Sequence, residues 1–305
     1  MDIVVVGDLN VDLVLTGLPA LPAYRELRVA KGMRFALGGS SGIFACNAAC
    51  LGSRVGFVGK VGEDEFGDFL QCRLKESGVD TSHLVRGRTE RTGICISMSF
   101  PEEYAMVSYA GIRETFRLED VNLEYVKTAR HLHMSGYYLL PAMRPGVVSL
   151  FREAKQAGLT TSLDPDHDAS GKWDNGIGEL FPFVDFFFPN EHESLCITGS
   201  SDLGTAATRL RGGPANTVIK RGAEGALVVS GSTTLSVPAF RVKPVDTTGA
   251  GDSFNAGFIF QFLQDATLEK CVRWGNACGA LSTQALGGTE GFPNVSEVER
   301  FLEGR

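Results

Sequence analysis

A short run near the C-terminus combines small residues with one carboxylate, in the order Asp246-Thr247-Thr248-Gly249-Ala250-Gly251-Asp252-Ser253-Phe254. The small residues let the backbone approach a ligand closely, and the residues after them are typical of a helix start. Free N–H groups at a helix N-terminus bind anions such as phosphate. Within such an anion site the carboxylate of Asp252 and a phosphate would repel each other, which indicates a chemical role for Asp252: it would take a proton, as a base does, from a hydroxyl attacking a phosphoryl group. The alternative is a Gly-rich turn whose Asp caps the helix.

Three stretches of the chain together resemble one protein family. The run from Asp246 to Phe258 looks like the C-terminal signature of the ribokinase-like (phosphofructokinase-B-type) carbohydrate kinases. Gly38-Gly39, Leu51-Gly52 and the run 56–67 are similar to the N-terminal signature, and Pro189-Asn190-Glu191-His192-Glu193 resembles the Asn-x-x-Glu motif. These matches occur in order over nearly the whole chain. They imply a kinase that uses ATP and Mg²⁺.

The resemblance also implies which residues meet the nucleotide. Asp252 would be the general base, and the backbone N–H groups of Gly249, Ala250 and Gly251 would hold the charge that develops on the γ-phosphate. The ATP-binding residues expected from the family are Asn190, Lys220, Gly222, Gly225 and Asn276. Each has a simpler alternative: a helix cap for Asn190, a solvated side chain for Lys220, a hairpin turn for the glycines and a helix surface for Asn276.

Two cation sites follow from the same resemblance. Glu193 would organise Mg²⁺ through water, although it could instead complete a capping box with Asn190. Asp246 and Thr248, with the loop 283–288, match the place where many family members bind a monovalent cation, so K⁺ is a candidate. That site uses mostly backbone carbonyls, and Asp246 could equally cap a turn.

The acceptor site is expected near the N-terminus. Asn10 and Asp12 match family positions that contact sugar hydroxyls, and Gly38 and Gly39 would let the backbone reach the substrate. Ile43 stands where the family usually has an Asn facing the sugar, which allows an acceptor with an apolar portion. Asn47, one helical turn further, could supply the amide instead if the helix register differed.

The segment 164–168, Asp-Pro-Asp-His-Asp, is acidic where related sugar-acid and fructose kinases often carry an Arg. This favours phosphorylation of a primary hydroxyl on a neutral sugar or sugar-like acceptor. A nucleoside kinase of the same family is the alternative. A catalytically silent, nucleotide-binding regulatory protein is a third reading, disfavoured by the intact run 249–252.

Composition excludes several other classes of protein. The chain has 305 residues, 43% hydrophobic and 21% charged, with a net charge of −7 and no Lys/Arg-rich run. Nucleic acid and anionic membranes are therefore not expected partners. The seven cysteines form no Cys-x-x-Cys pair, and no signal peptide or membrane span is visible, so we expect a cytoplasmic protein with reduced thiols.

The order of the predicted elements points to an α/β fold. Strands and helices alternate after about residue 130, as in a mostly parallel sheet flanked by helices. Strand-like runs at about 11–37 and 91–112 lack helices between them; the second includes a hairpin around residues 101–103. The resemblance implies that both insertions form a small β-sheet lid on a single α/β kinase domain, through which a homodimer could form. His131 and His133 share one strand face and are interpreted as hydrogen-bonded core residues.

Overall fold

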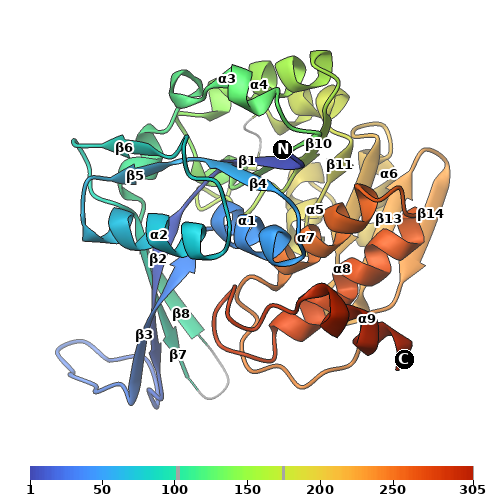
Figure 1. Cartoon of the computed structure of the whole chain (residues 1–305). Helices are drawn as coiled ribbons and strands as arrows, with labels where there is room; N and C mark the ends of the chain where they lie inside the picture. Colours follow the sequence, from blue (N-terminus) through green and yellow to red (C-terminus); the bar gives the residue numbers. More distant parts are fainter. Residues whose placement is uncertain (101–103, 174–175, 305) are drawn as a thin grey trace.

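A sheet of eight strands crosses the molecule between two groups of helices (Figure 1). The computed structural model describes residues 1–100, 104–173 and 176–304. The strand order is β14-β13-β12-β11-β10-β9-β1-β4; β13 pairs antiparallel with both β12 and β14, and the other described neighbours are parallel. The strands are β1 (Ile3–Gly7), β4 (Val55–Val58), β9 (His131–Ser135), β10 (Thr160–Leu163), β11 (Phe186–Phe187), β12 (Asn216–Lys220), β13 (Ala226–Ser230) and β14 (Thr233–Val237).

The β-branched run of β1 explains why the sheet needs helices on both faces. Ile3 and Val5 point into one hydrophobic core, while Val4 and Val6 point into the other, and all four are fully buried. The first core is covered by α1 (Ser40–Cys50), α2 (Glu65–Glu76), α7 (Ala250–Phe262), α8 (Leu268–Ser282) and α9 (Val295–Glu303). The second is covered by α3 (Leu123–Val126), α4 (Arg144–Gln156), α5 (Glu191–Thr198) and α6 (Leu203–Leu210).

A separate sheet of four strands extends from the main body (Figure 1). Its order is β3-β2-β7-β8, formed by β2 (Asn10–Thr16), β3 (Gly32–Gly38), β7 (Ile94–Ser99) and β8 (Tyr104–Tyr109). The expected hairpin turn at 101–103 lies outside the described residues. A further pair joins β5 (Lys60–Gly62) to β6 (Val85–Gly87). The predicted fold class, a mostly parallel sheet flanked by helices with a small separate sheet, is confirmed; the single-domain division and the lid limits stay predictions.

The two histidines of β9 belong to a buried hydrogen-bond chain. His131 contacts the hydroxyls of Thr160 and Ser162, and His133 contacts those of Ser162 and Ser135, at 2.7–2.8 Å. Burial lowers the pKa of His131 to about 3, so the ring is neutral at physiological pH. Both rings are therefore hydrogen-bonded core groups, in agreement with the sequence interpretation.

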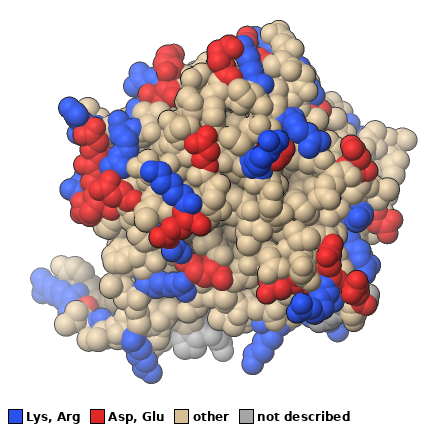
Figure 2. Space-filling model, in the orientation of Figure 1, with Lys and Arg blue, Asp and Glu red and all other residues tan. Residues whose placement is uncertain are grey.

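Surface charge is mixed in sign. Lys and Arg side chains alternate with Asp and Glu over the face drawn in Figure 2. In the described part of the chain, none of the helices has the length and hydrophobicity needed to cross a membrane.

Candidate active site

The run 249–252 forms the start of α7, as the sequence predicts. Gly249 precedes the helix with φ of 71°, in the left-handed region that favours glycine. The helix itself offers no carbonyl partner to the N–H groups of Gly251 and Asp252 in its first turn. These donors and the positive end of the helix dipole therefore face an adjoining cavity, which Ala250, Gly251 and Asp252 line.

Asp252 is 8% exposed and sits inside this anion-binding turn. Burial, reinforced by the negative charge of Asp164, raises the pKa of Asp252 well above its usual range, and the ammonium of Lys220 opposes the rise. A carboxylate with a raised pKa is a stronger base than an ordinary one. It is thus suited to take a proton from a hydroxyl near neutral pH.

Lys220 ends β12 and pairs with Asp164, which follows β10. The same oxygen of Asp164 accepts a hydrogen bond of 2.6 Å from Asn255 Nδ2 on α7. Burial acts against the charge of Lys220, but Asp164 and Glu193 outweigh it and raise the pKa of Lys220. Lys220 is therefore a fixed cation at the carboxyl ends of the parallel strands, where α/β folds bind ligands.

Asn190 and Glu193 form a capping box at the start of α5. Asn190 Oδ1 accepts from Glu193 N at 2.8 Å, and the Glu193 carboxylate accepts from the backbone and side-chain nitrogens of Asn190 at 2.7 Å. Burial, with the charge of Asp164, raises the pKa of Glu193 to about 8. The capping reading is thus correct as structure, and both residues also line the cavity.

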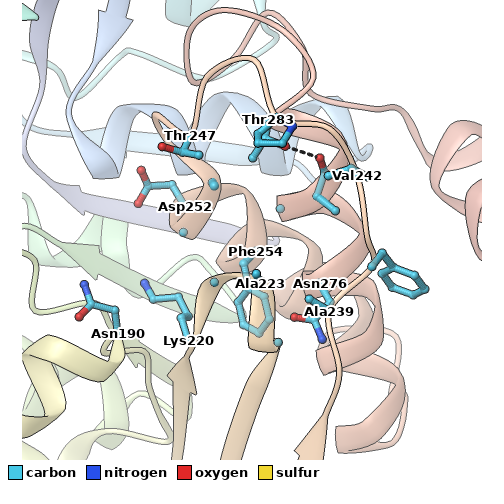
Figure 3. Close-up of a pocket in the computed structure, with 18 of the residues that line it drawn as sticks. Asn190, Lys220, Ala223, Ala239, Val242, Thr247, Asp252, Phe254, Asn276 and Thr283 are labelled. Atoms are coloured by element: carbon cyan, nitrogen blue, oxygen red, sulfur yellow. Dashed lines mark hydrogen bonds between the residues drawn. The ribbon is translucent and has the colours of Figure 1, made fainter. Parts of the chain in front are cut away.

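The cavity has a volume of about 680 Å³, in the range of small-molecule sites. In Figure 3, Asp252, Lys220 and Asn190 lie on one side of it, while Ala239, Val242 and Asn276 lie on the other. The second side is mostly apolar, as a purine base requires. Other apolar or small residues that line the cavity are Ala223, Phe240, Pro244, Phe254, Gly279 and Ala280.

The three other predicted nucleotide residues also reach this cavity. Gly222 (φ 53°) has open space where a side chain would project. Gly225 (φ 89°) has the carbonyl of Val237 2.1 Å from an ideal Cβ, so close backbone packing demands a glycine. Asn276 donates from Nδ2 to the carbonyls of Val237 and Pro238, which holds the β14 end against α8. The predicted nucleotide residues are thus brought together from four distant parts of the chain.

The acidic side chains of this site fit a metal ion that is bound through water and phosphate and not by direct ligands. Asp164, Asp166, Glu193 and Asp252 share the cavity wall with Lys220 and Arg241, so acidic side chains outnumber basic ones there. Burial, with the charge of Asp8, raises the pKa of Asp166 to about 6. Among the described residues, no three acidic, His or Cys side chains lie close enough to ligate an ion directly. An excess of acidic over basic side chains fits Mg²⁺ that is bound through water and phosphate oxygens.

The predicted acceptor residues gather where β1 passes into the lid. Asn10 Nδ2 donates to Asp12 Oδ1 at 2.7 Å, and an ideal Cβ on Gly38 would lie 2.2 Å from that oxygen. Gly39 (φ 87°) precedes α1, beside Asp8. Burial raises the pKa of Asp12 to about 7, with the Asn10 amide opposing the shift. Asp12 therefore titrates near physiological pH.

Ile43 and Asn47 of α1 face the start of α7 and the loop around Gly288. An ideal Cβ on Gly288 would lie 2.6 Å from Ile43 Cδ1, and one on Gly249 3.1 Å from Ile43 Cγ2. Asn47 Nδ2 donates to Ser253 Oγ and to the carbonyl of Gly288. Asn47 thus ties α1 to α7, and its amide is occupied in this structure.

Asp246 joins the two loops of the expected monovalent-cation site. Its carboxylate accepts 2.9 Å hydrogen bonds from the backbone N–H groups of Thr248 and Gly287. The N–H groups of Val245 and Asp246 donate to the carbonyl of Thr283. The structure therefore brings 245–248 beside 283–287, and the cation itself stays a prediction.

Sequence reasoning missed the roles of two acids in the segment 164–168. It placed the segment at the acceptor end, whereas Asp164 and Asp166 line the cavity that carries Lys220. Asp168 instead accepts hydrogen bonds from the N–H groups of Ser170, Lys172 and Trp173, which shapes a turn. The only sequence signal for these acids was their alternation after a buried strand. Arg113, which donates a hydrogen bond to Asn10 Oδ1, was also missed, because no motif marks it.

Comparison with known proteins identifies the class of this fold and site. The model of the pfkB family carbohydrate kinases matches residues 1–295, so the chain belongs to that family and is an ATP-dependent carbohydrate kinase. A 2-dehydro-3-deoxygluconokinase of Bacillus subtilis is 33% identical over 279 residues, covering 87% of this chain and 86% of the relative. A ribokinase of Haemophilus influenzae is 28% identical, covering 98% and 97%.

Solved structures agree with this assignment. An Arabidopsis thaliana ribokinase complexed with ribose and ATP has a TM-score of 0.85 and 25% identity, covering 99% of this chain and 98% of the other. An Escherichia coli protein described as a putative ribokinase II, in complex with ATP and Mg²⁺, has a TM-score of 0.86 at 24% identity, covering 100% and 99%. The likeness to the Escherichia coli structure is evidence for the fold alone.

Gly251 offers a direct test of the anion-binding turn. An ideal Cβ there would lie 3.3 Å from Lys220 Nζ, inside the cavity. We expect Gly251→Ala to lower kcat/KM for ATP about tenfold, roughly 1.4 kcal/mol, with little change in melting temperature. Steady-state kinetics and thermal melting measure the two effects.

Gly257→Ala on the same helix is the matched control. Its Cβ would lie 2.6 Å from Cys278 Sγ in the core, so it should cost about 1–3 kcal/mol of stability while leaving KM for ATP unchanged. Normal kcat/KM for ATP in Gly251→Ala would show that this glycine serves packing alone.

Proposed function

We propose that this kinase phosphorylates a primary hydroxyl of a sugar or sugar-like acceptor, with Asp252 as general base. The observation that carries the proposal is a buried carboxylate of raised pKa in the first turn of α7, beside Lys220 and the N–H donors of the helix. The acceptor oxygen attacks the γ-phosphorus of ATP, its proton passes to Asp252, and the bond from the γ-phosphorus to the bridging oxygen breaks. ADP leaves with that oxygen.

The remaining residues bind and orient the nucleotide. Gly249, Ala250 and Gly251 present the α7 N-terminus to the γ-phosphate, and Lys220 adds a fixed positive charge. Gly222, Gly225 and Asn276 border the side that receives the adenine, and Asn190 lies on the phosphate side. Glu193 would hold Mg²⁺ through water; the ion neutralises phosphate charge when it is bound.

Asn10 and Asp12, with Gly38 and Gly39, would contact the acceptor, and Ile43 supports the loop beside it. The relatives differ in their named acceptors: one is named for a sugar acid, another for ribose, and a fold neighbour is an adenosine kinase. A nucleoside acceptor is therefore the alternative to a sugar. Whether the acceptor is neutral, as 164–168 led us to predict, is a separate question, since Asp164 and Asp166 lie on the nucleotide cavity.

Replacement of the base tests the proposed mechanism. Asp252→Asn keeps the size of the side chain and removes its charge, so turnover should fall by about two orders of magnitude or more while ATP still binds. The readout is ATP consumption over a panel of sugars, sugar acids and nucleosides, in buffers with either K⁺ or Na⁺ as the monovalent cation. A K⁺-dependent rate would support the site at Asp246 and Thr248.

Asp265→Asn makes the same chemical change in the exposed turn that follows α7 and should leave turnover unchanged. Near-normal turnover in a folded Asp252→Asn variant would exclude Asp252 as the base. ATP consumption that never depends on any acceptor in the panel would favour the silent, nucleotide-binding alternative.

A homodimer through the lid is the assembly we propose. One lid face carries a row of apolar residues in register, formed by Phe35, Leu13, Ile96 and Val107. Phe35 and Val107 are 42% and 60% exposed, with Met33 beside them at 65%. Sedimentation should show a dimer that Val107→Lys dissociates; a wild-type monomer at micromolar concentration would contradict it.

All seven cysteines are free thiols, which supports the cytoplasmic location we propose.

A further inference from the structure

Arg113 is a buried cation without an acidic partner. It follows β8 in a short 3₁₀ turn (Gly111–Thr115) and is 7% exposed. Nη1 donates to Asn10 Oδ1 and Nη2 to Ser108 Oγ, both at 3.2 Å, while Nε is buried with no hydrogen-bond partner. Among the residues that the structure describes, no carboxylate lies within ion-pair distance of its guanidinium.

Such an arrangement is costly unless a ligand completes it. A buried charge loses its hydration, and protein interiors compensate that loss with an opposite charge and full hydrogen bonding. Here the donors meet only two neutral oxygens, and one nitrogen meets none. The planar guanidinium fork matches a carboxylate, which can accept two parallel hydrogen bonds from it.

The position of Arg113 links it to the acceptor site. In the lid, Asp12 pairs with Cys95, and Cys95 pairs with Ser108, so Asp12 and Ser108 share one face of the sheet. This face is opposite to the apolar row described above, because side chains alternate along a strand. Arg113 contacts that polar face through Ser108 and contacts Asn10 at its inner end.

A series of hydrogen bonds connects the acceptor site to the nucleotide cavity. Asp8, two residues before Asn10, accepts hydrogen bonds from the N–H groups of Ser40 and Ser41 at the start of α1. Ser40 lines the cavity and donates through its hydroxyl to Asp166. An acceptor in contact with Asn10 and Asp12 would therefore have one end near Arg113 and the other toward Asp252.

We infer that Arg113 binds a carboxylate of the acceptor, so that the kinase prefers a sugar acid to the neutral sugar of the same length. This inference rests on the proposed function. A single guanidinium near Asp12 neutralises one negative charge, which suits a monoanionic carboxylate better than a dianionic phosphate. Of the acids in 164–168, Asp164 is paired with Lys220, Asp166 accepts a hydrogen bond from Ser40, and Asp168 accepts from N–H groups of its own turn.

The test compares acids with their neutral counterparts on the full chain. Gluconate, ribonate and 2-dehydro-3-deoxygluconate are measured beside glucose, ribose and fructose, by ATP consumption and, without ATP, by calorimetric binding. At least one acid should exceed every neutral sugar about tenfold or more in affinity or kcat/KM. Arg113→Gln should raise KM and Kd for that acid roughly ten- to hundredfold and leave KM for ATP and the neutral sugars unchanged.

Two variants separate recognition from structural support. Arg117→Gln removes the same charge from an exposed position four residues away and should change nothing. Arg113→Lys keeps the charge without the fork and should restore part of the acid preference lost in Arg113→Gln. Equal losses for acids and neutral sugars in a folded Arg113→Gln variant would show that Arg113 merely supports Asn10, and would overturn the inference.

The outcomes also distinguish this inference from the kinase proposal. If no acid exceeds its neutral counterpart in wild-type protein, the inference fails, and Asp252-dependent turnover of a neutral sugar would leave the kinase proposal intact. If acids bind through Arg113 but no acceptor promotes ATP consumption, the proposed reaction fails instead.

Discussion

The site depends on a buried ion pair between Lys220 and Asp164. Lys220 ends β12 and Asp164 directly follows β10, with β11 between the two strands in the sheet, and Asn255 of α7 donates to the same Asp164 oxygen. Removing both charges from water is unfavourable, and only close pairing with further hydrogen bonds offsets the cost. Breaking the pair would leave one charge buried alone. The pair therefore fixes where α7 begins relative to the sheet.

The position of α7 decides the chemistry of Asp252. Asp252 is near enough to Asp164 and Lys220 to feel both charges, and they act in opposite directions on its pKa. Burial adds to the effect of Asp164, so the carboxylate becomes a strong base beside helix N–H groups that attract phosphate. The N-terminus of α7 therefore provides both the proton acceptor and the anion-binding site. Asp246 ties the loop before α7 to the loop 283–288, and Asn47 of α1 donates to Ser253 of α7 and to the carbonyl of Gly288.

Local patterns predicted the parts of the structure that local forces determine. The run 249–252 begins α7 because glycine tolerates the left-handed turn before it. Asn190 and Glu193 were recognisable as a capping box from their spacing alone. Each of these features depends on residues close together in the sequence.

The features that sequence reasoning missed depend on contacts between distant segments. Asp164 meets Lys220 across 56 residues, and Arg113 meets Asn10 across 103. No spacing in the sequence announces either contact, because sheet order and lid pairing create them. The orientation of α1 was equally beyond a linear pattern: Ile43 and Asn47 both turn toward the loop around Gly288, which only the packing of α1 on α7 decides.

The pH dependence of kcat tests the central claim, that burial raises the basicity of Asp252 and that the opposing charges of Asp164 and Lys220 adjust it. At saturating MgATP and acceptor, kcat should rise with pH through the pKa of the base, above the range of an ordinary aspartate. Lys220→Gln removes a charge that lowers this pKa and should move the acid limb to higher pH; Asp164→Asn removes one that raises it and should move the limb to lower pH. Opposite shifts of about half a pH unit or more would support the account. A limb in the ordinary aspartate range, or one that both variants leave in place, would contradict it.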